Sequence, residues 1–146
     1  MFNFDLNKID KVLRDAKIAR VGFAADFNAA RKKGVQSPTL YVLPLDDNYD
    51  DAGSVTGEDE YIVTEIFAVM IVLPCLAGNK NSDTEIKTLR SKVKQAIAGC
   101  AFSPWQPIKL HRGRTVELSR ETNNLIYQCQ FKVVGNVTVK TKVIEG

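Results

Sequence analysis

The longest uninterrupted apolar segment of the chain is the eight residues from Ile66 to Leu73. Successive side chains of a strand point to opposite faces, so a run that is apolar at every position fits a strand buried on both faces. Eight residues are too few for a membrane-spanning helix, which needs roughly 18 or more. The segment Tyr61 to Leu73 is therefore predicted to be the longest strand, central in its sheet and ended by Pro74.

The remaining patterns predict an α+β fold. Apolar residues at helical spacing predict a helix that starts after Asp5 and ends near Lys17. The capping-box segment Ser82 to Glu85 predicts the start of another helix. A short helix or turn is expected between them along the chain. The apolar stripe of the second of these helices, which is expected to cover the sheet, comprises Ile86, Leu89, Val93, Ile97 and Cys100. The short helix or turn is expected over Ala24 to Lys33.

Several shorter segments read as strands. The alternation of apolar and polar residues over Leu125 to Val134 predicts a half-buried antiparallel strand. Gly113 predicts a bulge or tight bend within the strand Ile108 to Leu118. Gly135 and Asn136 predict a turn into a C-terminal edge strand or extended arm, residues 137–146. Further strands are expected at Ile18 to Phe23 and Thr39 to Leu43.

Together these elements fit one domain spanning residues 1–146, because domains cluster near 100 to 150 residues. The predicted fold is α+β, with a mainly antiparallel sheet of about five strands and two to three helices packed on one face.

Charge is distributed unevenly along the chain. Residues 1–45 and 61–146 are both basic in balance, whereas residues 46–60 contain seven carboxylates and no basic residue. Mutual repulsion should keep such a segment extended and solvated, so a mobile acidic loop is expected over 46–60. Loops of this length are uncommon without a function, and the alternatives are a binding loop and a disordered insertion. The carboxylates are Asp46, Asp47, Asp50, Asp51, Glu58, Asp59 and Glu60.

No catalytic or ligand-binding motif is found. The three cysteines include no CxxC pair, and His111 is the only histidine, so neither a two-histidine metal site nor a supported Cys/His nucleophile pair is expected. The glycines never form a phosphate-binding GxGxxG or GxxxxGK[ST] motif, and the acidic segment lacks the spacing of a calcium loop. We therefore expect a protein that is not an enzyme and that has no cofactor and no metal. The first residues lack the features of a secretory signal, which predicts synthesis and residence in a cytoplasm.

The most compact basic group is Lys109, Arg112 and Arg114, with His111 beside it. Clusters of this kind neutralise phosphate, so DNA binding has to be weighed, but the acidic segment and the absence of interleaved aromatic residues argue against it. Separate acidic and basic patches suit self-association, in which the acidic segment of one subunit meets the basic residues of the next. Heterologous contacts of this type close into rings. An exposed strand bend on a solvated face is the alternative for Arg112 and Arg114.

The order of several short motifs resembles the phage tail terminator family of long-tailed phages. The resemblance covers roughly residues 38–134, and the segment from Val137 to Gly146 lies outside it. The motifs are Tyr41-Val-Leu-Pro-Leu45, Val63-Thr-Glu-Ile-Phe-Ala-Val69, Leu89-Arg90 with Val93, and Trp105-Gln-Pro107 leading to Arg112-Gly-Arg114.

This resemblance implies a structural virion protein, assembled in the host cytoplasm, that forms a hexameric ring on the head-proximal end of the tail tube. The ring would end tube polymerisation and offer the surface on which the head docks. The implied partners are further copies of the chain, the tail tube protein and a head-completion or neck protein, with genomic DNA passing through the lumen without specific binding and no membrane contact. The alternatives are another neck component, such as a stopper protein, and a DNA-binding accessory protein.

Overall fold

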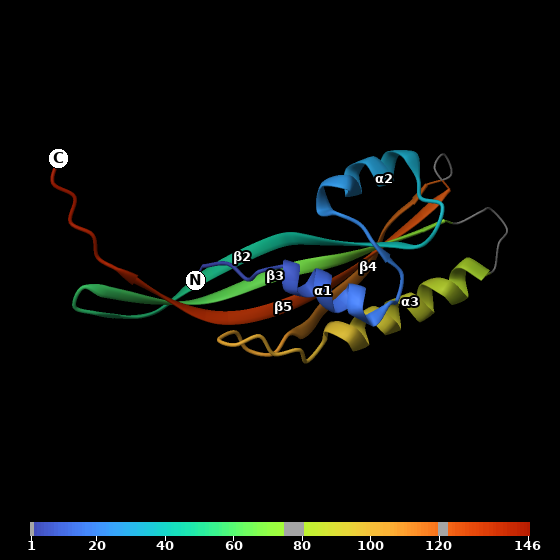
Figure 1. The fold of residues 1–146 in the computed structure, drawn as a ribbon. Coiled ribbons are helices and arrows are strands. Elements are labelled where there is room, and N and C mark those ends of the chain that lie inside the picture. The colour runs from blue at the N-terminus through green and yellow to red at the C-terminus, as the bar shows by residue number, and fades with distance from the viewer. Residues whose placement is uncertain (1, 75–80, 120–122) are drawn as a thin grey trace.

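The apolar run lies in the central strand of a five-stranded sheet (Figure 1). A computed structural model describes residues 2–74, 81–119 and 123–146. Every neighbouring pair of strands is antiparallel except β1 and β2, which are parallel. The predicted α+β class and the mainly antiparallel sheet are confirmed. In spatial order, the strands are β1 (Arg20–Val21), β2 (Thr39–Val55), β3 (Glu58–Pro74), β5 (Asn124–Lys140) and β4 (Lys109–Ser119).

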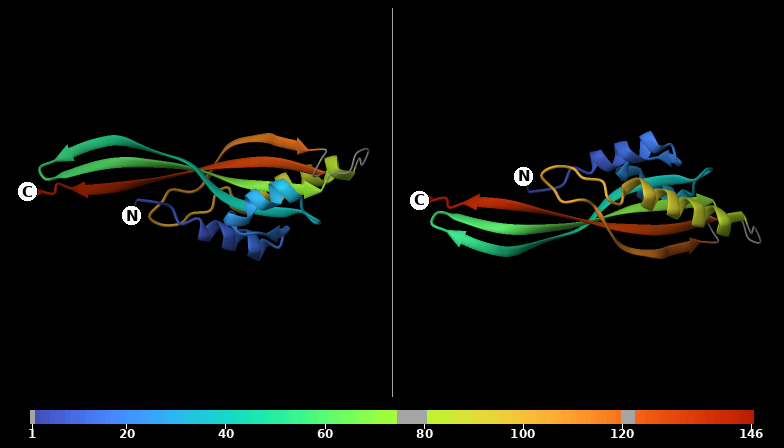
Figure 2. Two further views of the ribbon diagram at one scale, coloured as in Figure 1. Left: turned by 90° about the horizontal axis from the view of Figure 1, so that it is seen from above. Right: turned by 90° about the horizontal axis from the view of Figure 1, so that it is seen from below.

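Helices cover both faces of this sheet. On β3, Phe67 and Val69 point into a core cluster shared with α1 (Asn7–Ala16) and α3 (Asn81–Ile97). Ala68 and Met70, which alternate with them, join a smaller cluster against Phe27 and Ala30 of α2. The two faces are called here the α1/α3 face and the α2 face. The prediction that the helices share one face therefore holds for α1 and α3 but is wrong for α2 (Figure 2).

The helices α1 and α2 begin and end close to the residues that their sequences indicate. Asp5 accepts a hydrogen bond from the Asn7 backbone amide at 3.0 Å, which satisfies one of the free donors at the start of α1. Ile9 and Leu13 are fully buried, as their helical spacing predicts. The short element α2 (Phe27–Lys33) follows one 3-10 turn, Ala24–Asp26, and stops at Gly34. In α3 the predicted stripe is confirmed by the burial of Ile86, Leu89, Val93 and Ile97. The side chain of Ser82, in the predicted capping box, lies outside the described part of the chain.

The acidic segment forms strands, so the predicted loop over 46–60 is wrong. β2 continues past Pro44 to Val55, and a tight turn with Gly57 at φ 84° leads into β3. The Leu40 carbonyl faces β1, because it accepts a hydrogen bond from the Gly22 amide at 2.9 Å. Backbone polar groups alternate between the two edges of a strand, so the Pro44 nitrogen, four residues further on, points to the same outer edge. The missing N–H group of Pro44 therefore removes no backbone hydrogen bond to β3. A register shift between Pro44 and Asp46 marks a bulge at Leu45.

β5 is also longer than predicted. It runs through Gly135 and Asn136 without a turn and ends at Lys140, so the predicted turn is wrong. Gly135 is opposite Val63, and the indole of the buried Trp105 packs where a β-carbon would stand. The glycine makes room for this ring rather than bending the chain.

In β4 the predicted bulge at Gly113 is wrong, because the strand has one bulge before this residue and one after it. Register shifts leave His111 and Val116 unpaired, whereas Gly113 pairs with Cys129. The hydroxyl of Tyr127 occupies the space beside Gly113 that a side chain would need. Gly113 therefore allows a close approach of the tyrosine, and the bulges lie two residues before it and three residues after it.

The outer parts of three strands extend beyond the helices as an arm (Figures 1 and 2). The arm is defined as residues 46–66 of β2 and β3 together with residues 132–140 of β5, which are hydrogen-bonded to one another throughout. The N-terminal segment lies against the base of the arm, and residues 141–146 continue from its end without secondary structure. The arm carries the whole acidic segment away from the main core.

Candidate interaction surfaces

The seven predicted acidic residues come together on the β2–β3 hairpin of the arm. The strand register divides them between the two faces of the hairpin. Six of the seven are exposed, and Asp59 is partly buried and accepts a hydrogen bond from the Ser54 hydroxyl at 2.7 Å. No ion pair holds any of them among residues 2–74, 81–119 and 123–146. Asp46, Asp50, Glu58 and Glu60 lie on the α2 face, and Asp47, Asp51 and Asp59 on the α1/α3 face.

An eighth carboxylate, Glu65, stands at the base of the arm directly opposite Asp47. It accepts a hydrogen bond from the backbone amide of Phe4, which ties the N-terminal segment to the arm. Burial raises the pKa of Glu65, the Phe4 amide opposes this shift, and the neighbouring Asp47 raises the pKa further. Like charges directly opposite each other on two strands are unfavourable. Glu65 was not selected from the sequence, although it lies within the Val63–Val69 motif.

Tyr49 supports the same contact from β2. Its hydroxyl donates to the Phe2 carbonyl at 3.4 Å, and interaction with the neighbouring Asp47 carboxylate raises the pKa of the tyrosine. The ring of Phe4 packs edge-on against Trp105 at a centroid distance of 5.6 Å. The arm therefore leaves the core at a base fixed by the N-terminal residues.

The three predicted basic residues come together on β4, at the opposite edge of the sheet from β2. Lys109, Arg112 and Arg114 pair with Lys132, Gln130 and Gln128 of β5, so their side chains lie on the α2 face. All three are exposed. The sequence did not single out Lys132, which the sheet places beside them. The acidic and basic sets are thus separated within one chain: the acidic set lies on the β2–β3 hairpin of the arm, and the basic set lies on the edge strand β4.

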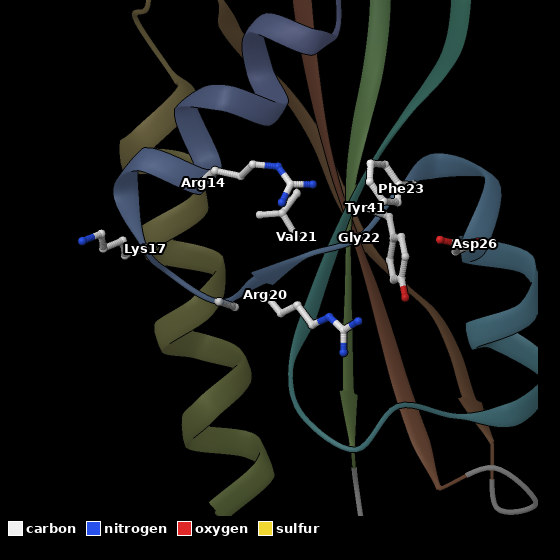
Figure 3. Close-up of a pocket in the computed structure, with 9 residues that line it drawn as sticks. Arg14, Lys17, Arg20, Val21, Gly22, Phe23, Asp26 and Tyr41 are labelled. Carbon is white, nitrogen blue, oxygen red and sulfur yellow. The ribbon is translucent and has the colours of Figure 1, made fainter.

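A hollow of about 710 Å³ lies between α1, β1 and the 3-10 turn (Figure 3). Arg14 and Arg20 point into it beside the exposed ring of Phe23 and the buried ring of Tyr41. Burial raises the pKa of Tyr41, and the charge of Arg20 opposes that shift. Arg14 is already paired with Asp10 at 2.8 Å near the C-terminal end of α1, where cations complement the helix dipole. These residues therefore have a structural explanation without a ligand.

The cysteines and His111 are the remaining candidates for chemistry. Cys129 is buried, and burial raises the pKa of its thiol, which disfavours the reactive thiolate. Cys75 lies outside the described residues. Within the described ranges, no three His, Cys, Asp or Glu side chains gather closely enough to hold a metal ion. No helix in those ranges is long and apolar enough to cross a membrane.

The fold is an α+β domain with a long, charged arm, and comparison with known proteins gives its class as a structural protein of the phage tail. The chain belongs to the phage tail terminator protein family, whose model matches residues 1–139. This match extends beyond residues 38–134, where the motifs lie, and includes most of β5. Membership places the protein in the virion tail.

Other comparisons add little to this assignment. A chain from the virion of a native gene transfer agent particle is 16% identical, with a TM-score of 0.43. That likeness covers 64% of this chain and 66% of the other, so this chain spans just under two thirds of its length. The TM-score is too low to establish a shared fold. No curated protein matches the sequence.

Proposed function

We propose that the protein forms a ring on the head-proximal end of the tail tube, where it ends tube polymerisation and provides the surface on which the head docks. Membership of the tail terminator family supports this function. The observation that carries it is the separation of charge: acidic residues occupy the free part of β2 at one edge, and basic residues occupy β4 at the other. An acidic edge that meets the basic edge of the next copy is a heterologous contact, and such contacts form a ring when the rotation from copy to copy closes.

The proposed ring has six copies and binds the tail tube protein on one side and a head-completion or neck protein on the other. The interface residues proposed from the sequence are the seven carboxylates of the arm together with Lys109, Arg112 and Arg114. Genomic DNA passes through the lumen without specific binding, and assembly takes place in the host cytoplasm. The proposed role is structural and involves no catalysis.

Light scattering and negative-stain imaging test this proposal. The mass of the purified protein is measured over a range of protein and salt concentrations, and the protein is then imaged with its cognate tail tubes. The expected result is a six-fold ring that caps one tube end and that loosens as salt rises, because salt screens contacts between exposed charges.

A monomer at every concentration that leaves the tubes uncapped would contradict the proposal. Binding to filled heads rather than to tubes would instead indicate another neck component. Duplex DNA affinity that falls steeply with salt would indicate a DNA-binding accessory protein.

A further inference from the structure

We propose that Lys109 and Lys132 form the receiving site for a second copy of this chain, whose acidic β2 edge supplies Asp46 and Asp50. This inference rests on the proposed ring and specifies which groups join its subunits and in which direction. Lys132 belongs to no surface that the sequence predicts.

The two lysines form a like-charged cross-strand pair on the α2 face of the sheet. They lie directly opposite each other on β4 and β5, where cross-strand β-carbons are about 4.5–5.5 Å apart. Lys109 is exposed and Lys132 is partly buried. Neither is in an ion pair with any residue in the described part of the chain. Two cations held this close repel each other, so a carboxylate brought between them is favourable to both.

The same chain carries the complementary groups on the same face. Lys132 is opposite Ile66 of β3, which is opposite Asp46 of β2, so the lysine pair and Asp46 share one row on the α2 face. Asp50 lies on that face further along the arm, opposite Ile62. Both aspartates are exposed at the free edge of β2. Ile66 separates Asp46 from the lysines of its own chain, so the two charges are matched only by a neighbouring copy.

Strand direction favours a head-to-tail contact. Three successive antiparallel pairings separate β2 from β4, so β4 and the free part of β2 beyond β1 run in opposite directions. When β2 of one copy lies beside β4 of the next, the antiparallel order continues and the α2 faces adjoin. Both edges contain two register shifts, which interrupt regular backbone pairing. Side-chain charges therefore carry the contact.

A second copy explains more of the surface than DNA does. DNA would neutralise the basic row but would leave the arm carboxylates unmatched, and their negative charge would repel phosphate. A second copy matches the basic row and the acidic edge at once.

Two charge-reversed variants test the proposal. The first carries Lys109→Glu and Lys132→Glu, and the second carries Asp46→Lys and Asp50→Lys. Each variant places like charges at both sides of its own contact, so each alone is expected to have the 16.2 kDa mass of a single chain in light scattering. In an equimolar mixture each acidic surface meets a basic one, so rings with alternating subunits recover the wild-type mass.

The matched control for the lysine variant carries Lys11→Glu and Lys92→Glu. These substitutions change the net charge by the same amount as the lysine variant does, at exposed positions of α1 and α3. It is expected to assemble as the wild type does. Far-ultraviolet circular dichroism verifies that each variant is folded, and the milder Lys132→Gln is expected to weaken assembly if a reversal disrupts the fold.

The proposal is overturned if the wild type forms rings and caps tubes while either reversed variant still assembles alone, or while the mixture stays monomeric. In both cases the proposed function would stand. A wild type that neither assembles nor caps tubes would contradict both proposals. A lysine variant that keeps its ring but no longer binds duplex DNA would show that the two lysines bind phosphate instead.

Discussion

At the scale of single residues, Glu65 carries a charge that its surroundings disfavour. It is partly buried and opposite Asp47, and only the Phe4 amide favours its ionised form. Because its pKa is raised in the folded protein, the stability that Glu65 contributes is present at low pH and lost as pH rises through the folded pKa. Near neutral pH the ionised carboxylate is therefore a net cost.

Glu65→Gln removes this charge and retains an oxygen that can accept the Phe4 amide. Relative to this variant, the wild type should gain stability as pH falls from 7 to 4, by less than about 1 kcal/mol because solvent screens the group. Urea unfolding at the two pH values measures the difference. Glu65→Ala, which leaves the Phe4 amide without its acceptor, should cost about 1–2 kcal/mol at pH 7. A Gln variant with the same pH dependence as the wild type would contradict the argument.

Gly135 is required by packing rather than by backbone conformation. A β-carbon at this position would lie 2.6 Å from Trp105 Cε3 and 2.9 Å from Cζ3, closer than carbon atoms can approach without displacement. Gly135→Ala should therefore destabilise the fold by about 1–3 kcal/mol, as overpacking of a core does. Chemical denaturation measures the loss. Asn136→Ala, at the exposed next position, should change stability by at most about 0.5 kcal/mol. Equal effects of the two substitutions would exclude a specific clash with the indole.

At the scale of elements, predictions held where burial decides the structure. The central strand and the buried stripes of α1 and α3 followed from apolar spacing alone. The face covered by α2 did not, because α2 is short and has no fully buried residue whose spacing would indicate a face. Gly135 and Asn136 look like a turn locally, yet the apolar phase of Phe131 and Val133 continues at Val137, which would have indicated one strand.

The candidate interaction surfaces could also be predicted only in part. The acidic and basic residues could be selected by charge, but the sequence gives no strand register. Lys132 and Glu65 became visible only when the sheet placed them beside Lys109 and Asp47. Charge repulsion alone predicts a loop for the acidic segment, because it takes no account of a partner strand. The hairpin divides those charges between two faces, which reduces their mutual repulsion.

The arm should open more readily than the core although both are hydrogen-bonded sheet. Residues 46–58 are exposed throughout, whereas Phe67 to Leu73 are buried, so the arm has little apolar burial to oppose local unfolding. In the free protein, amide exchange at 47–55 should be about 100-fold faster than at 67–73. When the ring forms, hydrogen exchange at the arm amides should slow, while exchange in the core should not change. Equal protection of both segments in the monomer would contradict a mobile arm.

At the scale of the whole molecule, the net charge of +3 conceals two surfaces of opposite sign. If contacts between them hold the proposed ring, assembly has to weaken as the Debye length contracts from about 10 Å at 0.1 M salt to about 3 Å at 1 M. Replacing Asp46, Asp47, Asp50 and Asp51 by Asn removes one side of the contact while keeping similar shape and polarity.

This neutralised variant should assemble less at 0.05 M salt than the wild type, and its mass should depend little on salt because few contacts remain to be screened. Light scattering at about 0.05, 0.15 and 0.5 M NaCl measures both slopes. Changing Asp10, Asp15, Asp83 and Glu85 to their amides removes as many charges from the helices and should leave the wild-type slope intact. A neutralised arm that still loses assembly steeply with salt would show that other charges hold the subunits together.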